Sequence, residues 1–315
     1  MSNIFSKYEK LNNDLKLVKE VIYQELNTEE VEFNKTIKKY FNGNAKLIRP
    51  AFVLIAASYK DDYKSKENII SAASAEMLHV ATLIHDDIID DAKLRRGVST
   101  IHNDYDAGYA VICGDYLYAK SYQLLFRNAS LSALKYVSEK VCNMAFGEVE
   151  QYIEKYNHEL TIDKYLEITA NKSAAFFQSN LIIGAKLAGI SKDEEEVLAD
   201  FGLNYGMMFQ VQDDILDYIN VTDSKPIKND LKRGVFTLPL LMYMQENPEI
   251  KNYIIDENYD FVLKSIQESK AIPSSIDLYE MYYKNFKSIL SKISSIKVVE
   301  YLNHVLDVTY RRVEW

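Results

Sequence analysis

Apolar residues recur at steps of three and four through nearly the whole chain, and this helical periodicity is the strongest constraint on the fold. The opening segment, residues 3–27, shows it at Ile4, Tyr8, Leu11, Leu15, Val18 and Ile22. The 315 residues include only 5 Pro and 10 Gly, so turns are few and long helices are favoured over a sheet-rich fold. No alternating strand pattern reaches a useful length. The sequence therefore predicts an all-α fold, a single large helical bundle.

The helical pattern continues without a linker, a repeat or a low-complexity tract, which predicts one domain over residues 1–315. Arg49-Pro50 is expected to open a helix, because proline is tolerated in the first turn. A polar segment, residues 220–233, interrupts the pattern, and helices are expected again from about 235. The other expected helices cover residues 68–91, 107–127, 131–157, 162–188 and 193–219.

The composition restricts the partners and the compartment. The formal net charge is −9, which argues against nucleic acid as a partner and requires any phosphate site to be built from a few placed cations. Two cysteines, Cys113 and Cys142, form no metal-ligand spacing. The N-terminus has no apolar signal core, and the apolar stretch 52–57 is too short to span a bilayer. A reduced, cytoplasmic protein is expected.

An acidic cluster, Asp86-Asp87-Ile88-Ile89-Asp90-Asp91, directly follows an apolar run that should be buried. On a helix, Asp86 and Asp90 lie one turn apart and share a face. A solvated acidic surface is the alternative interpretation, but it fits poorly beside a buried run. Carboxylates at the end of a buried helix need a cation.

A second cluster, Asp213-Asp214-Ile215-Leu216-Asp217, repeats the spacing of two Asp, two apolar residues and one Asp. Two copies on separate helices are a much stronger signal than one. Mg²⁺ prefers a few carboxylates together with water and phosphate oxygens. The two clusters therefore predict Mg²⁺ sites that hold a diphosphate.

Basic residues near these clusters could bind diphosphate. Arg95-Arg96-Gly97 follows the first cluster, and arginine matches phosphate oxygens with a planar fork; charge balance for the nearby Asp is the alternative. His79 lies seven residues before Asp86 on nearly the same helix face, although a hydrogen-bonded core histidine would fit equally well. Further candidates are Lys46 and Arg49 before Pro50, Lys172-Ser173 in an apolar helix, and Lys225 after the second cluster.

These motifs resemble those of the trans-isoprenyl diphosphate synthases, also called polyprenyl synthetases, over about residues 46–239. The segments that carry the resemblance are His79 to Asp90 with Arg95-Arg96-Gly97, Gly147-Glu148-Val149-Glu150-Gln151, Lys172-Ser173, and Phe209 to Asp217. The resemblance implies a helical bundle of the isoprenoid synthase type with a central cavity. It also implies Mg²⁺-dependent condensation of isopentenyl diphosphate with an allylic diphosphate.

The resemblance also assigns roles to residues. Mg²⁺ would be bound by Asp86, Asp90, Asp213 and Asp217, with Asp87, Asp214 and Lys172 also taking part in catalysis and Gln151 near the metal waters. Isopentenyl diphosphate would be held by Lys46, Arg49, His79 and Arg96. The allylic diphosphate would contact Arg95, Lys172, Ser173, Gln210 and Lys225.

Product length would depend on the residues just before the first Asp cluster, which are bulky in short-chain members of the family. Here Ala81 and Thr82 are small, so the resemblance implies a tunnel limited deeper, by Leu78, Met77 or tyrosines of the next helix, and an all-trans product longer than C20. The chain also departs from the family pattern, because Val235 stands where a diphosphate-contacting Lys is usual.

The expected assembly is a homodimer, and a second, non-identical subunit stays open. Four other interpretations also stay open at this point: a short-chain synthase, a class I terpene cyclase, a non-catalytic subunit of a heteromeric synthase, and an unrelated helical scaffold with acidic patches. A cyclase would need only one diphosphate site, whereas this chain carries a separate second set of basic residues. A non-catalytic subunit would be expected to lose carboxylates from one cluster, and both clusters are complete.

Overall fold

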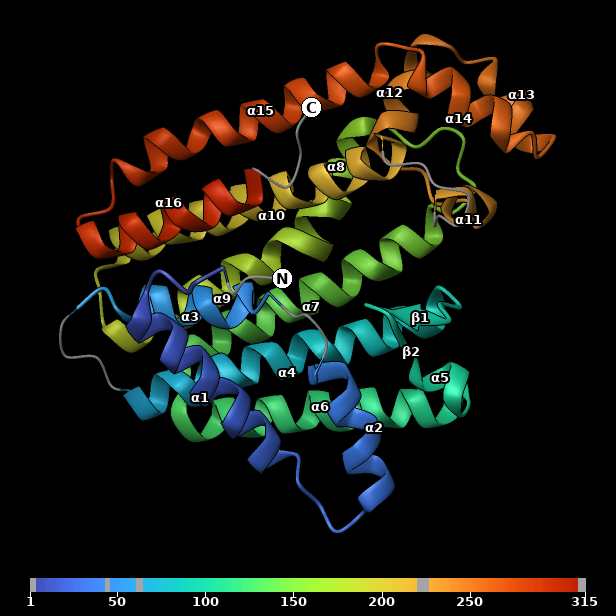
Figure 1. Cartoon of the computed structure of the whole chain (residues 1–315). Helices are drawn as coiled ribbons and strands as arrows, with labels where there is room; N and C mark the ends of the chain where they lie inside the picture. The colour runs from blue at the N-terminus through green and yellow to red at the C-terminus, as the bar shows by residue number, and fades with distance from the viewer. Residues whose placement is uncertain (1–3, 43–45, 61–64, 220–226, 311–315) are drawn as a thin grey trace. The chain divides into compact units, whose positions relative to one another are not determined.

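A computed structural model describes residues 4–42, 46–60, 65–219 and 227–310. These residues form helices α1 to α16, one π-helical segment and one small hairpin (Figure 1), so the predicted all-α class is confirmed. Two compact units emerge. The first comprises Met1–Tyr136, Asn180–Glu195 and Ser295–Val308, and the second comprises Val137–Ser179, Glu196–Ser294 and Thr309–Trp315. The single-domain assignment of residues 1–315 stays a prediction.

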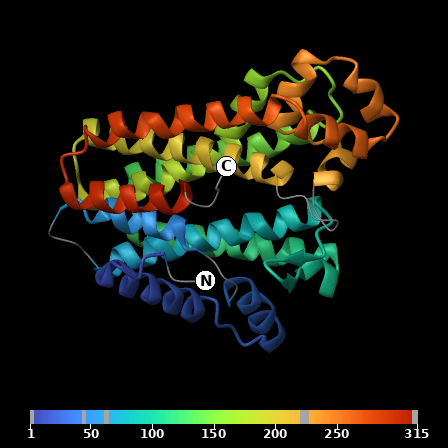
Figure 2. The ribbon, with the colours of Figure 1, turned by 45° about the horizontal axis from the view of Figure 1, so that its top comes forward.

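The first unit is organised around α4, a 25-residue helix. Residues 71–81 of α4 are buried without interruption, as expected for a helix that is surrounded by others. It packs against α6, α3 and α1, and α4 and α6 run side by side in both views (Figures 1 and 2). The elements of this unit are α1 (Glu9–Glu25), α2 (Val31–Asn42), α3 (Ile48–Ala57), α4 (Ser65–Ile89), β1 (Leu94–Arg95), β2 (Val98–Ser99), α5 (Ile101–Asp104) and α6 (Ala107–Asn128).

The second unit has the buried residues of α10 at its centre. Tyr205 is fully buried there, and its ring lies 5.0 Å from the Phe177 ring and 6.3 Å from the Phe201 ring. Helix α12 packs against α8 and α15. The elements of this unit are α8 (Ile162–Thr169), the π-helical segment η1 (Ala170–Ala174), α11 (Ile227–Lys232), α12 (Leu238–Glu246), α13 (Ile250–Ile255), α14 (Tyr259–Gln267) and α15 (Ala271–Leu290).

Four helices carry the chain from one unit into the other: α7 (Leu131–Ile153), α9 (Ala175–Ala188), α10 (Lys192–Ile219) and α16 (Ile296–Tyr310). Most expected helix boundaries agree with the structure within a few residues; α1 begins later, at Glu9, and α7 ends earlier, at Ile153. Among the described residues, no helix has both the length and the apolar composition that a membrane-spanning segment requires.

Two local features differ from the expected pattern. Residues 94–99 form an antiparallel hairpin, with Leu94 paired to Ser99 and Arg95 to Val98. Its two-residue turn, Arg96-Gly97, has φ angles of 53° and 82°, and a tight turn with two positive φ angles matches the twist of paired strands. The second feature is η1, which interrupts the expected helix 162–188. Pi-helical turns occur often at functional sites, and this one carries Lys172 and Ser173.

Candidate active site

The first Asp cluster lies at the C-terminal end of α4, and its members face different surroundings. Asp86 and Asp90 are one turn apart and partly exposed. Asp87 is fully buried; Tyr40 Oη donates to Asp87 Oδ2 at 2.9 Å and Arg95 Nε donates to Asp87 Oδ1 at 2.7 Å. The outer two carboxylates can therefore reach a ligand, whereas the middle one is held inside the fold.

The hairpin after α4 separates the two arginines. Arg95 lies in β1, and its Nη2 is 2.5 Å from Asp87 Oδ1, so this side chain is ion-paired with the buried aspartate. Arg96 is in the turn and is exposed. The hairpin therefore places the two neighbouring arginines in different surroundings, Arg95 beside a buried carboxylate and Arg96 at the surface.

His79 and Arg49 come together in the first unit. The distance from Arg49 Nη1 on α3 to His79 Nε2 on α4 is 3.0 Å. Burial, and then the positive charges of Arg49, Arg96 and Arg95, lower the pKa of His79 well below its usual range. A neutral imidazole can accept a hydrogen bond from Arg49 and keep the guanidinium in place. The structure therefore brings Arg49 and His79 into contact, and the positive charge of Arg96 also acts on His79. Lys46 is partly exposed and precedes α3.

Glu76 belongs to the same surroundings, and none of the sequence motifs identifies it. It lies one turn before His79 on α4 and is only 3% exposed. Burial raises the pKa of its carboxyl, and the charges of Arg49, Arg96 and Lys19 oppose that rise. The signal that could have identified it was a carboxylate in the run 72–81, whose other residues are Ala, Ser, Met, Leu, His and Val.

The second Asp cluster, on α10, repeats the arrangement of the first. Asp213 and Asp217 are partly exposed, and Asp214 is 4% exposed. Three groups donate to the Asp214 carboxylate: Tyr165 Oη at 2.5 Å, Gln210 Nε2 at 3.0 Å and the backbone N–H of Leu238 at 3.1 Å. Burial raises the pKa of Asp214, while these hydrogen bonds oppose the rise.

The π-helical segment presents Lys172 and Ser173 toward α7 and α10. Lys172 Nζ lies 2.6 Å from Gln151 Oε1 and 2.6 Å from Glu148 Oε2, both on α7. Ser173 Oγ donates to Gln210 Oε1 at 2.8 Å. The structure thus joins the predicted residues Lys172, Ser173, Gln210 and Gln151 around one site. Lys225 lies outside the described residues.

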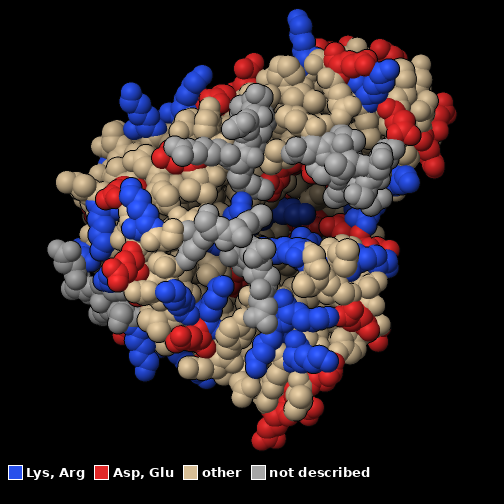
Figure 3. Space-filling view, viewed as in Figure 1, with Lys and Arg blue, Asp and Glu red and all other residues tan. Residues whose placement is uncertain are grey.

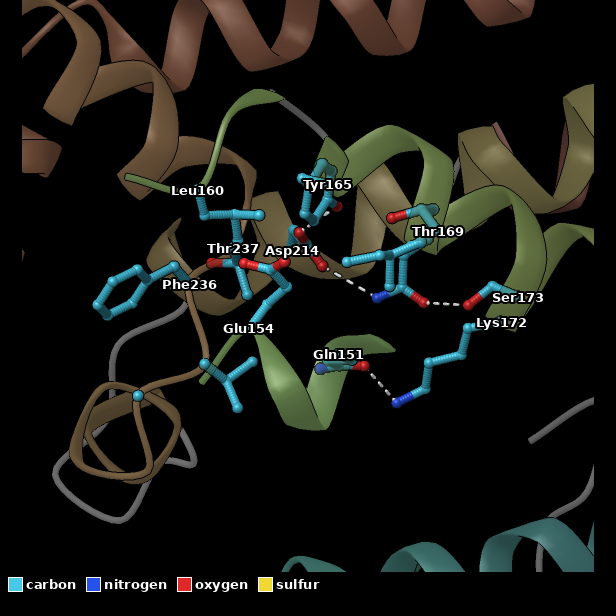
Figure 4. Close-up of a pocket in the computed structure, with 14 residues that line it drawn as sticks. Gln151, Glu154, Leu160, Tyr165, Thr169, Lys172, Ser173, Asp214, Phe236 and Thr237 are labelled. Atoms are coloured by element: carbon cyan, nitrogen blue, oxygen red, sulfur yellow. Dashed lines mark hydrogen bonds between the residues drawn. The ribbon is translucent and has the colours of Figure 1, made fainter. Parts of the chain in front are cut away.

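A pocket in the second unit contains about 590 Å³ of empty space, part of it open to solvent (Figure 4). Lys172, Ser173, Gln210 and Asp214 line it, and so does Val235. Figure 4 shows the hydrogen bonds that connect Tyr165 to Asp214 and Lys172 to Gln151 along its wall. On the face shown in Figure 3, Lys and Arg are interspersed with Asp and Glu.

The carboxylates fit Mg²⁺ in number and kind. Each cluster offers two partly exposed carboxylates one turn apart, Asp86 with Asp90 and Asp213 with Asp217. No group of three or more His, Cys, Asp or Glu side chains that could hold a metal ion occurs among the residues with described positions. Mg²⁺ usually takes one or two protein carboxylates and completes its shell with water and substrate phosphate oxygens. Pairs of carboxylates therefore suit an ion that arrives with a diphosphate.

The predicted chain-length residues lie on α4, below the first cluster. Leu78 and Ala81 are fully buried, whereas Thr82 is partly exposed and donates from Oγ1 to the His79 carbonyl at 2.8 Å. On α6, Tyr118 is partly exposed, and burial together with Tyr122 and Asp86 raises its pKa.

Comparison with known proteins assigns the chain to a family. The sequence profile of the polyprenyl synthetases matches residues 30–276. Component 2 of the heptaprenyl diphosphate synthase of Bacillus subtilis is 32% identical over 284 residues, which is 87% of this chain and 81% of that protein. The octaprenyl diphosphate synthase of Escherichia coli K12 is 31% identical over 280 residues, covering 85% and 86% of the two chains.

A solved structure agrees with these sequence relatives. The polyprenyl synthase of Caulobacter crescentus CB15, complexed with calcium and isoprenyl diphosphate, superimposes with a TM-score of 0.86 at 26% identity, covering 98% of this chain and 96% of that one. The chain belongs to the polyprenyl synthetase family and is a prenyltransferase. The predicted fold, family and enzyme class are confirmed.

Proposed function

We propose that the enzyme condenses isopentenyl diphosphate with an allylic diphosphate in a Mg²⁺-dependent reaction and releases an all-trans polyprenyl diphosphate longer than C20. The observation that carries the proposal is the presence of two outward carboxylate pairs, Asp86 with Asp90 and Asp213 with Asp217, together with a separate basic set around Arg49 and His79. The names of the heptaprenyl and octaprenyl relatives support a long product.

Lys46, Arg49, His79 and Arg96 bind the diphosphate of isopentenyl diphosphate. The contact between Arg49 and His79 supports this role, because a fixed guanidinium loses less entropy when it binds a phosphate. The low pKa of His79 supports a neutral ring that orients Arg49. A class I terpene cyclase has no need of this second set, which favours a two-substrate enzyme.

Arg95, Lys172, Ser173, Gln210 and Lys225 bind the allylic diphosphate. The shared pocket of Lys172, Ser173 and Gln210 supports the assignment. Val235 adds apolar surface to that pocket, so the described wall holds less positive charge than the family pattern would give it. We expect a weaker allylic site as a consequence.

The reaction breaks the bond between the allylic C1 and the diphosphate oxygen. Mg²⁺ held by the outward aspartates would neutralise the charge on the departing diphosphate. Lys172 stabilises the same developing charge, and it is held for this task by Glu148 and Gln151. The double bond of isopentenyl diphosphate then forms a carbon–carbon bond with the allylic cation. Loss of a proton, accepted by the released diphosphate, restores a double bond.

The active enzyme is a homodimer. An exposed apolar stripe on α7 supports this assembly, since its members recur at three- and four-residue steps: Phe146, Val149, Tyr152 and Ile153, each at least 50% exposed. A non-identical second subunit is the alternative, because the Bacillus subtilis relative is named as component 2. Light scattering on the purified chain distinguishes a dimer from a monomer that awaits a partner. A cytoplasmic location is supported by Cys113 and Cys142, which are both free.

The decisive experiment is product analysis by mass after incubation with Mg²⁺, isopentenyl diphosphate and allylic starters of different lengths. A ladder of products ending above C20 is expected. Products of C20 or shorter would indicate a short-chain synthase, and products formed without isopentenyl diphosphate would indicate a cyclase. Lys46→Ala and Arg96→Ala should mainly raise KM for isopentenyl diphosphate about ten- to a hundredfold, and Lys172→Ala should mainly affect the allylic substrate.

A further inference from the structure

Both Asp clusters are supported from behind by a buried tyrosine that belongs to another helix. Tyr40 on α2 donates to Asp87 Oδ2 at 2.9 Å, and Tyr165 on α8 donates to Asp214 Oδ2 at 2.5 Å. The other oxygen of each carboxylate also has a side-chain donor, Arg95 Nε at 2.7 Å in the first cluster and Gln210 Nε2 at 3.0 Å in the second. The same arrangement thus occurs twice, in different parts of the sequence.

Each tyrosine–aspartate pair receives one further hydrogen bond from a backbone N–H. Tyr40 is 5% exposed, and its hydroxyl accepts from the backbone N–H of Ile101, the first residue of α5, at 3.1 Å. Tyr165 is 9% exposed, and the backbone N–H of Leu238, the first residue of α12, donates to the same Asp214 oxygen. Each tyrosine–aspartate pair therefore joins three helices.

The helix ends that carry the clusters need such support. Asp86, Asp87 and Asp90 lie at the C-terminal end of α4, where the helix dipole disfavours negative charge. Asp213, Asp214 and Asp217 occupy the last two turns of α10. Like charges at positions i and i+4, Asp86 with Asp90 and Asp213 with Asp217, add repulsion. Without a cation, these turns would tend to fray or to turn their carboxylates apart.

We propose that Tyr40 and Tyr165 are positioning residues for metal binding, and that each holds its cluster with the outer two aspartates already facing outward before Mg²⁺ and diphosphate arrive. The inference rests on the proposed function. It assigns the middle aspartate of each cluster to the protein interior, as the acceptor that transmits the support of the tyrosine. Partners behind metal ligands commonly change metal affinity ten- to a hundredfold.

A purely structural role is the alternative, in which each tyrosine only satisfies a buried carboxylate. Tyr205 provides a matched control, because it lies on α10 eight residues before Asp213, is fully buried, and has its hydroxyl 2.8 Å from Thr309 Oγ1. Tyr205→Phe removes from the same helix a buried hydroxyl that is hydrogen-bonded to a threonine. Tyr165→Phe and Tyr40→Phe remove the hydroxyls that contact Asp214 and Asp87.

The test measures two quantities on the full chain of each variant: the Mg²⁺ concentration for half-maximal turnover, and the rise in Tm on adding Mg²⁺ with inorganic pyrophosphate. We expect Tyr165→Phe and Tyr40→Phe to need about tenfold more Mg²⁺ and to lose most of the Tm rise. Tyr205→Phe should lower the basal Tm and leave both quantities within twofold of the wild type.

Wild-type-like Mg²⁺ dependence and Tm rise in the two test variants would overturn the inference, as would an equal change in Tyr205→Phe. The two variants probe separate clusters, so the inference remains testable if one of them fails to fold. A wild-type chain with neither Mg²⁺-dependent turnover nor a Tm rise would instead refute the proposed function, and the inference with it.

Discussion

Replacing Gly147 by alanine tests whether close packing of α7 on the π-helical segment positions Lys172. A Cβ at residue 147 would lie 2.7 Å from the Lys172 backbone nitrogen, 3.0 Å from Asn171 Cβ and 3.1 Å from Lys172 Cα. Ordinary van der Waals contact starts at 3.4 Å, and the closest obstacle is backbone rather than a flexible side chain. The segment η1 must therefore move away from α7.

Two opposing terms set the change in stability. Overpacking a well-packed site costs about 1–3 kcal/mol, and alanine in place of glycine in a helix returns up to about 1 kcal/mol. We expect a net loss of about 1 kcal/mol, or a fall in Tm of about 2 °C for a chain of this size. The functional loss should be larger, because a shift of Lys172 breaks its contacts with Glu148 and Gln151. Misplacement by 1 Å can cost about a hundredfold, so about tenfold is expected for a smaller shift.

The assay compares kcat/KM for the allylic substrate, at saturating isopentenyl diphosphate, with Tm by differential scanning fluorimetry. Gly108→Ala is the control, because its new Cβ meets only Oδ1 of Asp106, a side-chain atom, at 3.2 Å. It should retain full activity. The reasoning is wrong if Gly147→Ala keeps kcat/KM within twofold of the wild type, or if Gly108→Ala loses as much.

Three further predictions address other parts of the site. Asp86→Ala and Asp213→Ala should each abolish turnover while Tm stays equal or rises, since removing one of several like charges at a helix end relieves repulsion; an active variant in a steady-state assay would contradict the metal assignment. Burial, and then the nearby arginines, lower the pKa of His79. The stability that the neutral His79 ring contributes is therefore fully present above about pH 6.5. Below that pH the free energy of unfolding falls by up to about 1.4 kcal/mol per pH unit, until the pH reaches the folded-state pKa of His79. Denaturant titrations between about pH 7 and pH 5 should show a shallower loss for His79→Gln, and identical slopes would refute this. Ala81→Phe should shorten the main product. Thr82→Phe is a second variant, because Thr82 is partly exposed and its replacement avoids overfilling a fully buried site. Unchanged product lengths in two active variants would show that the growing chain does not pass these residues.

The helices and the chemistry of the clusters were predictable because both depend on short-range spacing. Periodicity at three- and four-residue steps predicted α4, α6 and α10 within a few residues of their observed bounds. The repeated spacing of Asp86 and Asp213 with their neighbours predicted carboxylates on shared helix faces. The hairpin at Arg96-Gly97 escaped notice because strands of two residues leave no alternating pattern.

Other features could not be read from spacing, because they depend on contacts between distant residues. Tyr165 is 49 positions from Asp214 in sequence, and Tyr40 is 47 from Asp87. The π-helical turn at Lys172 depends partly on glycines of other helices, since a Cβ at Gly206 would lie 2.4 Å from Ala174 Cα. No local pattern distinguishes such a glycine from any other.

One part of the tyrosine arrangement nevertheless follows from helix geometry. Successive residues of an α-helix are about 100° apart, so residues i and i+4 share a face while i+1 points well away from both. A spacing of Asp-Asp-x-x-Asp that exposes its first and last members must turn its second member aside. If the helix end is packed, that member enters the interior and needs donors, because a buried charge without hydrogen bonds is very costly. Asp87 and Asp214 each accept from a tyrosine hydroxyl, which adds no charge, and Asp87 is also paired with the Arg95 guanidinium. The spacing thus predicts that the first and last aspartates are exposed and that the second is buried and needs donors. Only the structure identifies those donors.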